Sequence, residues 1–439
     1  MRRAWIWLIV SLSLTTLSTA QLGIYSLPEP YGDPVSLSGT ITRTNAGRIL
    51  TSNTLTDTIT LFDLNRTILA EFAIGENPNG VSITPDNRQA LAVSDSSLAI
   101  ISLDTNEVLA GYDIDGDPFA VVADDTYAYV SLQAEDAILV FDLENGITVN
   151  RINTPPAPSG MAKWGDFLYV THFWSGEFSL IYLPTAEVVR TIQPNPQGSL
   201  FASVEINPIN GIAYLPMSIA NEDEDATAGN RLIPMLYEVD LRLMSVQRSI
   251  NLSSADRNVS IPYAVRQPSN RSRLYVAYSG SDRVGVLNLD TGEVVEQFET
   301  GANPRGLVFS RDFTQIYTQD TVDAVVSLYD TRFFGLIDQI PVSTTPIDPQ
   351  EQIANRLFYT ATDTRLSRNG LMSCASCHWA GQSDGRRWLG ARTPNASYDP
   401  VTADWLNQHI EQLQGGNGLP LEGIDMDALL SLLQAPQSP

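Results

Sequence analysis

The two cysteines of this 439-residue chain and one of its three histidines lie within five consecutive positions, from Cys374 to His378. In the order Cys-x-x-Cys-His, two thiols one turn apart can each add across a vinyl group of haem, and the adjacent imidazole can bind the iron from the proximal side. Such thioether bonds would hold one haem c covalently. The motif therefore predicts Cys374 and Cys377 as haem-attachment residues and His378 as an iron ligand.

Three other interpretations of the motif fit the sequence less well. A zinc site needs further Cys or His ligands nearby, and the chain has no second cysteine pair. A thioredoxin-like redox pair needs a strand–helix–strand setting, which the surrounding sequence lacks. A simple disulfide across Cys-x-x-Cys closes a very small loop, restrains little of the unfolded chain and leaves His378 unexplained.

The sequence leaves open which group would occupy the other axial position of the iron. Met426 precedes a predicted final helix, and a methionine thioether there would raise the reduction potential for electron transfer. His409 lies beside the apolar stripe of another predicted helix and would give bis-histidine iron. An open position, which would favour peroxide-type chemistry, is the third alternative. Four arginines are candidates to pair with haem propionates: Arg365, Arg368, Arg386 and Arg392.

A repeat of about 40 residues fills most of the chain ahead of this motif and must position it. Its clearest marker is a proline in a Gly/Pro-rich turn before a hydrophobic strand, at Pro78, Pro118 and Pro304. Weaker copies occur at Pro158, Phe201, Pro262 and Pro346. Each unit contains short alternating or β-branched strands, which bury their faces only when several units stack. Residues 36–345 are thus predicted to form a β-propeller of about seven blades, with 36–45 supplying a strand that closes the ring.

Two strand segments support this architecture through a resemblance. Tyr169-Val170-Thr171-His172 and Tyr275-Val276-Ala277-Tyr278 resemble the motif of the YVTN family of β-propeller repeats. The resemblance implies a propeller but no particular activity, because propellers serve unrelated functions. His172 has no companion ligand in the repeat, so we interpret it as a structural or surface residue. The acidic, aperiodic residues 221–230 are predicted to be a loop inserted into one blade.

The chain changes character after Pro346. Helical patterns over residues 349–356, 399–414 and 426–433 predict a small α-helical domain spanning 346–439. Its core is thin for independent stability, and a covalently attached haem would supply the missing apolar contacts. The predicted fold class is therefore mainly β: a propeller of about seven blades followed by a small α-helical cytochrome c-like domain.

The residues around the motif resemble the first haem domain of bacterial dihaem cytochrome c peroxidases and MauG-like proteins. The similar stretches are Leu357-Phe358, Arg365-Leu366-Ser367, Ser373 to His378 and Ser383-Asp384-Gly385-Arg386. The resemblance implies haem and redox chemistry. The peroxidases of that family use a second haem on a second Cys-x-x-Cys-His, which this chain lacks, so their two-haem mechanism is not implied.

The N-terminus and the charge bear on location and partners. Residues 1–20 combine a short basic start, an apolar run and small residues up to Ala20, which predicts a signal peptide followed by a linker over 21–35. We therefore expect a periplasmic or secreted protein with no membrane span in the mature chain. The net charge of −24 argues against nucleic acid as a partner and favours a basic redox partner protein.

Together these features favour an exported c-type cytochrome domain with one covalent haem c, carried on a propeller and acting in electron transfer. A haem peroxidase-like oxidoreductase, shortened relative to the family, is a second hypothesis. A propeller binding module with a degenerate haem domain is a third.

Overall fold

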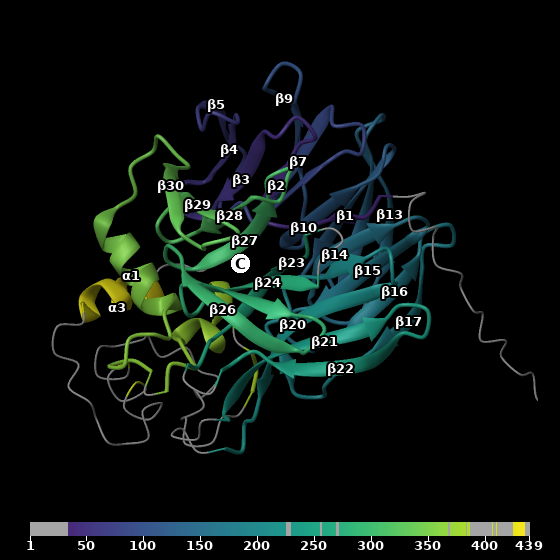
Figure 1. Cartoon of the computed structure of the whole chain (residues 1–439). Helices are drawn as coiled ribbons and strands as arrows, with labels where there is room; N and C mark the ends of the chain where they lie inside the picture. The colour runs from purple at the N-terminus through teal and green to yellow at the C-terminus, as the bar shows by residue number, and fades with distance from the viewer. Residues whose placement is uncertain are drawn as a thin grey trace, which may run out of the picture.

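The computed structural model describes residues 34–224, 230–254, 257–268, 272–367, 369–382, 384–386, 406, 410 and 425–434. The predicted signal peptide and nearly all of the predicted linker lie outside these residues. Seven antiparallel sheets are arranged around a common centre, with one strand of each facing inward (Figure 1). This confirms the mainly β fold class and the count of seven blades.

Each blade is built from strands that follow one another in the chain, from the innermost to the outermost. The first three blades are β2–β5 (Ile41–Arg43, Ile49–Asn53, Thr58–Phe62, Ile68–Ala73), β6–β9 (Gly80–Ile83, Gln89–Ser94, Ser97–Ser102, Glu107–Asp113) and β10–β13 (Pro118–Ala123, Tyr127–Leu132, Ala137–Asp142, Ile147–Asn153). The fourth comprises β14–β17 (Pro158–Trp164, Phe167–His172, Phe178–Tyr182, Glu187–Ile192). The fifth comprises β18–β22 (Gly198–Ser199, Glu205–Asn207, Ile212–Ala220, Leu232–Asp240, Ser245–Asn251), with both β18 and β19 paired to β20. The last two are β23–β26 (Pro262–Arg266, Arg273–Tyr278, Arg283–Asn288, Glu293–Glu299) and β27–β30 (Pro304–Phe309, Gln315–Asp320, Val325–Asp330, Leu336–Pro341).

The marker prolines Pro118, Pro158, Pro262 and Pro304 are the first residues of inner strands, and Pro78 lies two residues before one. Asn77, Asp117 and Asn303, which directly precede marker prolines, all have positive φ angles of 49–59°. Asn and Asp tolerate this left-handed conformation better than other non-glycine residues, and a proline at the first position of a strand removes no ladder hydrogen bond. The marker therefore encodes the turn by which the chain enters the next blade. Pro346 is the exception, since it lies between β30 and a helix and begins no strand.

Apolar side chains fill the space between neighbouring blades. Strands in the middle of a blade, such as β11 and β12, are buried along nearly their whole length, whereas the outer strand β13 is exposed at most positions. A middle strand is covered on both faces by adjacent blades, which explains its continuous run of hydrophobic residues. The radial stacking predicted from the repeat is thus the source of the core.

The N-terminal residues follow a path that the repeat does not predict. β1 (Ser36–Leu37) lies beside β14, the inner strand of the fourth blade, and pairs with Ala162 and Lys163. The Ser38 amide donates to the Met161 carbonyl at 3.0 Å, and Gly39 bridges to Val81 in the second blade. The segment then enters β2, the inner strand of the first blade. Residues 36–40 therefore run inside the propeller channel before the first blade begins.

The ring is closed by packing between two complete blades. The prediction that residues 36–45 supply a strand that closes the ring is wrong. Of the strands in this segment, β1 pairs with the fourth blade and β2 belongs to the first blade, and the seventh blade is completed by its own β30. Ile41 and Phe62 pack against Tyr317, Val326 and Leu328 of the seventh blade. Polar contacts across the same seam include Arg66 to Asp338 at 2.7 Å and the Thr344 amide to Glu71 at 3.0 Å.

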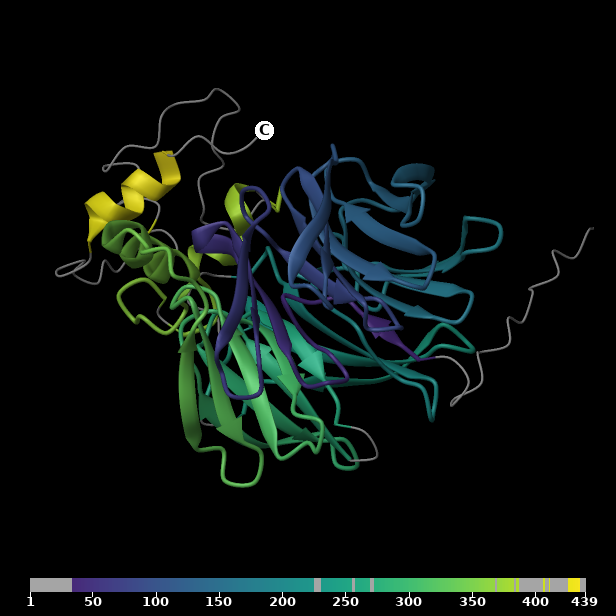
Figure 2. The same cartoon turned by 90° about the horizontal axis from the view of Figure 1, so that it is seen from above.

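Helices α1 and α3 lie outside the ring of blades (Figure 2). α1 (Pro349–Tyr359) begins at Asp348, whose side chain accepts hydrogen bonds from the Gln350 and Glu351 amides. α3 (Met426–Gln434) corresponds to the predicted final helix and packs against α1. Short 3-10 turns span Thr54–Thr56 (η1), Cys374–Ser376 (η2) and Trp379–Gly381 (η3). Of the helix predicted over 399–414, only Leu406 and Ile410 are described, and both are helical and buried.

The predicted insertion over 221–230 falls in the hairpin between β20 and β21, the second and third strands of the fifth blade. Its residues 225–229 lie outside the described part of the chain. Within the described residues, no helix has both the length and the apolarity needed to cross a membrane.

Candidate haem-attachment site

The two cysteines and His378 come from a single tight turn. The Cys374 carbonyl accepts hydrogen bonds from the amides of Cys377 at 3.2 Å and His378 at 3.0 Å. The Ser373 amide donates to the Ser376 hydroxyl at 3.0 Å, and the Ser376 amide donates to the Ser373 carbonyl at 3.0 Å. These bonds satisfy the ends of a turn too short to do so internally. The turn thus presents two thiols and an imidazole from adjacent positions, as the motif predicts.

The two thiols are free and partly buried, and they contact different apolar surfaces. Cys374 packs against the apolar cluster that contains Phe358, and Cys377 contacts a smaller one made by Ala220, Leu232 and Met372. Burial raises the pKa of Cys374 to about 11 and that of Cys377 well above its usual range, despite the guanidinium groups of Arg231 and Arg386 near Cys377. Both cysteines are therefore neutral thiols at neutral pH.

His378 is held as a neutral imidazole. Burial lowers its pKa, and the nearby Asp384 carboxylate only partly opposes this shift. The neutral ring is the form that binds a metal ion. Free thiols beside a neutral imidazole, set against apolar side chains, are a donor set that fits a haem attached by thioether bonds. Among the described residues, no group of three or more His, Cys, Asp or Glu side chains is placed to hold a metal ion, so the fit depends on His378 alone as an iron donor there.

Trp379, the next residue, lies in the mouth of the propeller channel. Its indole is 4% exposed and stacks on Tyr263 of the sixth blade, with ring centroids 5.0 Å apart. It also contacts Phe173 of the fourth blade at 5.7 Å and Tyr359 of α1 at 5.3 Å. The guanidinium carbon of Arg305, from the seventh blade, lies 4.6 Å from the Trp379 ring centroid. Three blades and one helix thus fix the residue that follows His378.

Hydrogen bonds also join residues 361–386, the segment that contains the motif, to loops of several blades on one face of the propeller. The Trp174 indole donates to Gln382 at 3.2 Å, and Gln382 donates to Asp117 at 2.9 Å. Arg386 pairs with Glu222 at 2.9 Å and donates to the Gly198 carbonyl at 3.0 Å. The Ala361 amide donates to the Gly280 carbonyl at 2.7 Å, and Ser260 donates to the Leu371 carbonyl at 2.5 Å. The attachment segment is therefore seated on the propeller at several blades.

One apolar cluster joins the helices to the propeller. It contains Phe358 and Leu429 from the helices together with Phe173, Tyr263 and Leu307 from the blades. The sequence predicts a C-terminal domain with a thin core of its own. In the structure the described helices share a core with the blades, because the aromatic residues of α1 and the motif turn toward the channel mouth.

The other sequence-predicted site residues are only partly accounted for. Met426, at the start of α3, is partly buried against the same cluster as Cys374. His409 lies outside the described residues, as do Arg368 and Arg392. Of the two described candidate arginines, Arg365 pairs with Asp363 at 2.5 Å and Arg386 pairs with Glu222 at 2.9 Å. Both guanidinium groups therefore already have a carboxylate partner.

His172 is a structural residue. It is fully buried, and its ring nitrogens lie 3.1 Å from the Pro156 carbonyl and 2.9 Å from the Ser179 hydroxyl. Desolvation lowers its pKa to about 4, so it is neutral in the folded protein. The structural interpretation of this histidine is confirmed, and the surface alternative is wrong.

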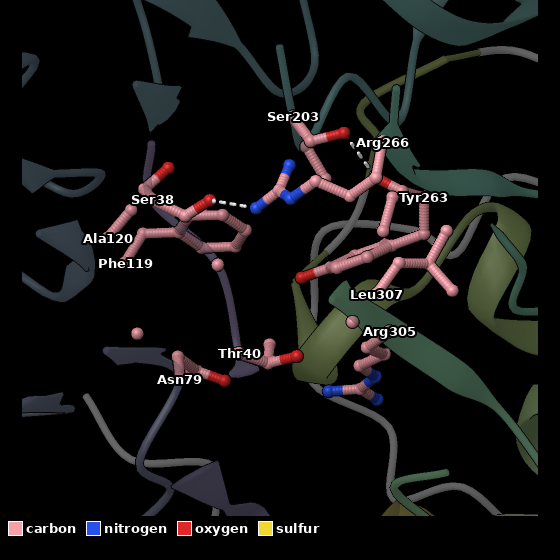
Figure 3. Close-up of a pocket in the computed structure, with 15 residues that line it drawn as sticks. Ser38, Thr40, Asn79, Phe119, Ala120, Ser203, Tyr263, Arg266, Arg305 and Leu307 are labelled. Carbon is pink, nitrogen blue, oxygen red and sulfur yellow. Dashed lines mark hydrogen bonds between the residues drawn. The ribbon is translucent and has the colours of Figure 1, made fainter. Parts of the chain in front are cut away.

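The channel contains a small cavity of about 20 Å³, lined among others by Tyr263 and Arg305, which both contact Trp379 (Figure 3). Its lining includes the residues that follow four of the marker prolines: Asn79, Phe119, Tyr263 and Arg305. Tyr263, Arg305 and Trp379 are not among the site residues predicted from the sequence. The positions of Tyr263 and Arg305 could have been found from the repeat, because the residue directly after a marker proline faces the channel in the four cases above.

Comparison with known proteins identifies the fold and no family. No protein-family model and no curated protein matches the sequence. Hydrazine synthase of Kuenenia stuttgartiensis is similar with a TM-score of 0.61 at 17% identity, covering 74% of this chain and 99% of that one. The β-propeller domain of Cps50 (Swd1) from Myceliophteria thermophila is similar with a TM-score of 0.54 at 10% identity, covering 68% of this chain and all (100%) of that one.

A third structure, dihydro-heme d1 dehydrogenase NirN in complex with DHE, has a TM-score of 0.48 at 13% identity, covering 70% of this chain and 67% of that one, and is too distant to support an argument. At such identities the likeness is one of architecture. In all, 1483 solved chains match, so the propeller by itself selects no activity and function must be argued from the site.

Proposed function

We propose that this protein carries one haem c, attached through Cys374 and Cys377, and acts in electron transfer. The observation that supports this most directly is the motif turn, in which two free thiols and a neutral imidazole occupy adjacent positions against apolar side chains. When bound, the haem would supply an iron centre that takes up and releases one electron at a time. His378 is the proposed proximal ligand of that iron.

The protein's own residues would hold this centre rigidly. The turn fixes the relative positions of Cys374, Cys377 and His378, and Trp379 anchors the turn in the channel mouth. A fixed ligand geometry limits the structural change that accompanies a change of iron charge, which suits electron transfer. The propeller, in this proposal, is the platform that supports the haem site and presents it to a partner.

Met426 is the proposed sixth ligand. It is the described candidate that shares an apolar cluster with Cys374, and it lies at the start of a helix that packs on α1. The cluster also contains Leu430 and Leu433 from the same helix, so the thioether would approach the iron through apolar surroundings. A thioether ligand in such surroundings favours the reduced iron and raises the reduction potential.

Export and partner choice follow from the same proposal. Thioether attachment of haem takes place outside the cytoplasm, in agreement with the predicted signal peptide at residues 1–20. The net charge of −24 would attract a basic redox partner and accelerate its encounter at low ionic strength. We therefore propose a periplasmic or secreted location and a basic electron-transfer partner.

The test is expression of the full chain in the periplasm together with a c-type haem maturation system. Covalent haem is expected to remain on the protein after denaturing electrophoresis and to be visible by peroxidase staining. Changing both cysteines, Cys374→Ala and Cys377→Ala, should abolish the stain. Met217→Leu, a volume-conserving change in the core of the fifth blade, is the control and should retain it.

Two results would count against the proposal. A wild-type protein that is exported and folded but carries no stain would show that the turn does not accept haem. Staining that survives the double cysteine change would place the attachment elsewhere. Folding of each variant is checked by circular dichroism, since the β-rich spectrum of the propeller reports on it independently of haem.

A further inference from the structure

The central channel of the propeller is closed from two directions. Residues 36–40 occupy it along the inner strand β14, running from Lys163 toward the start of that strand. Trp379 closes the opposite mouth, where it is 4% exposed. The cavity of about 20 Å³ described above lies between them, lined by Ser38 and Thr40 of the N-terminal segment and by residues of the inner strands (Figure 3).

Two arginines line this cavity, and they differ in their partners. Arg266 is paired with Glu205 at 3.6 Å and donates to the carbonyls of Val265 at 2.8 Å and Ser38 at 3.0 Å. Its charge is therefore paired with a carboxylate, and both of its Nη atoms donate a hydrogen bond. Glu205 lies outside the cavity lining, which contains no aspartate or glutamate.

Arg305 has no such balance. It is 5% exposed, and its single side-chain hydrogen bond runs from Nε to the side-chain Oδ1 of Asn303 at 2.6 Å. The rings of Tyr359 and Trp379 lie 4.6 Å from its guanidinium carbon. Within the described part of the chain, neither Nη atom has a hydrogen-bond partner and no carboxylate lies within ion-pair distance. A buried guanidinium in this state has donors and charge left for a ligand.

The remaining polar groups indicate what kind of ligand fits. The hydroxyls of Ser203 and Thr40 already donate, to the Tyr263 carbonyl at 2.7 Å and to Gln319 at 2.9 Å. Unused donors at the cavity include the Nη groups of Arg305, the side-chain amide of Asn79 and the phenol hydroxyl of Tyr263, all of which can donate to an anion. The cavity volume of about 20 Å³ has room for one water molecule or one ion of similar size, since a water molecule needs about 10–15 Å³.

From this geometry we infer that the channel cavity is a binding site for one small monovalent anion of the size of chloride, held by the Nη groups of Arg305. The anion would balance a buried charge for which the described residues supply no carboxylate. The inference goes beyond the proposed haem function and does not depend on it, because every group it uses belongs to the propeller, the N-terminal segment or the aromatic rings around Arg305.

The direct test is a crystal structure of the full chain grown with bromide as the sole halide. An anomalous peak is expected in the cavity within hydrogen-bonding distance of an Arg305 Nη atom. A well-ordered cavity that holds only water at high bromide concentration would overturn the inference. So would bromide bound throughout the surface but absent from this position.

A solution test separates specific binding from general salt effects. Thermal unfolding is followed at constant ionic strength while chloride replaces gluconate, which is too large for the cavity. The wild-type midpoint should rise by roughly 1–3 °C with chloride. Arg305→Gln should lose this response, whereas Arg332→Gln, which removes an exposed arginine from the same blade, should keep it. An equal chloride response in Arg305→Gln and wild type would refute the site. Should Arg305→Gln fail to fold, Arg305→Lys retains the charge, and the bromide experiment on the wild type decides.

Discussion

The indole of Trp379 stacks on the phenol ring of Tyr263 at a centroid distance of 5.0 Å and an interplanar angle of 21°. This contact joins the residue after His378 to an inner strand more than 110 positions earlier in the chain. It means that the proposed haem-binding turn and the propeller are one packed unit. The stability of the turn should therefore respond to changes at the channel mouth.

Trp379→Ala is expected to lower the free energy of unfolding by about 3–5 kcal/mol, because it removes a buried aromatic side chain and leaves a cavity. Trp379→Phe keeps most of the stacking area and should cost clearly less. Chemical denaturation monitored by circular dichroism measures both. Equal stability of the alanine variant and the wild type would show that the channel mouth does not hold the segment.

Met426→Ala tests the proposed sixth ligand. If the Met426 thioether binds the iron, the variant should change from a six-coordinate, low-spin optical spectrum to a high-spin one, and the reduction potential should fall. Met217→Leu, in the core of the fifth blade, serves as the control and should leave the spectrum unchanged. A low-spin spectrum that persists in Met426→Ala would assign the position to another residue, with His409→Ala as the next variant. A high-spin wild type would instead favour the peroxidase-like hypothesis.

Asp320 should make the stability of the protein fall as the pH rises from about 4 to 7. It is fully buried, and desolvation raises its pKa to about 7, although Gly301, Thr318 and Ser327 donate hydrogen bonds to it. Between pH 4 and 7 the folded state holds a proton that the unfolded state has released. The contribution of this group to stability is therefore complete below about pH 4 and is lost as pH rises through 7.

Asp320→Asn should remove this dependence, because an amide keeps the carbonyl acceptor for Gly301 and can donate toward Thr318. The difference in unfolding free energy between variant and wild type should shift in favour of the variant from pH 4 to pH 8, by up to about 4 kcal/mol. Asp312→Asn, an exposed change in the same blade, is the control, since hydrogen bonds from Ser310 and Thr314 lower its pKa. Parallel pH profiles for Asp320→Asn and wild type would contradict the assignment.

Gly160 marks a close approach of two blades. A Cβ added there would lie 2.7 Å from the Ser203 Cα of the next blade, and also against the Ala202 carbonyl, which is backbone that cannot rotate away. Gly160→Ala is expected to destabilise the protein by about 1–3 kcal/mol. Gly111→Ala, in the outer strand β9 with nothing within 4 Å of its added Cβ, should be neutral or slightly stabilising. Urea unfolding midpoints of the two variants provide the comparison, and an equal loss in both would point to backbone preference as the cause.

The repeat made the propeller predictable because each blade is built from hairpins between neighbouring segments. Local turn residues such as Asn77 and Asp117 carry that information directly in the sequence. The motif turn was predictable for a similar reason, since Cys374 to His378 are consecutive. In both cases the signal lies within a few residues of the structure it specifies.

The channel contents were not predictable from such local signals. Ser38 meets Met161, and Trp379 meets Tyr263, through contacts between residues more than 100 positions apart. The sequence around Ser38 and around Trp379 has no repeat pattern from which their contact residues could be predicted. Seven markers predicted seven blades, and seven is correct for a reason that the markers do not show. Pro346 is a marker that starts no blade, whereas the first blade starts with β2, which has no marker, so the two errors cancel in the count.

The pairing of β1 with β14 also has a consequence for the order of folding. The residues at 36–40 are made before any blade, yet their partners at 161–163 come only when the fourth blade has been synthesised, and the contact of Thr40 with Gln319 waits for the seventh. Residues 36–40 must therefore stay unpaired until the later blades are made and the ring forms around them. Such long-range closure predicts slow folding. It also makes the late joining of the first and seventh blades, rather than any single blade, the step at which unfinished chains are most exposed.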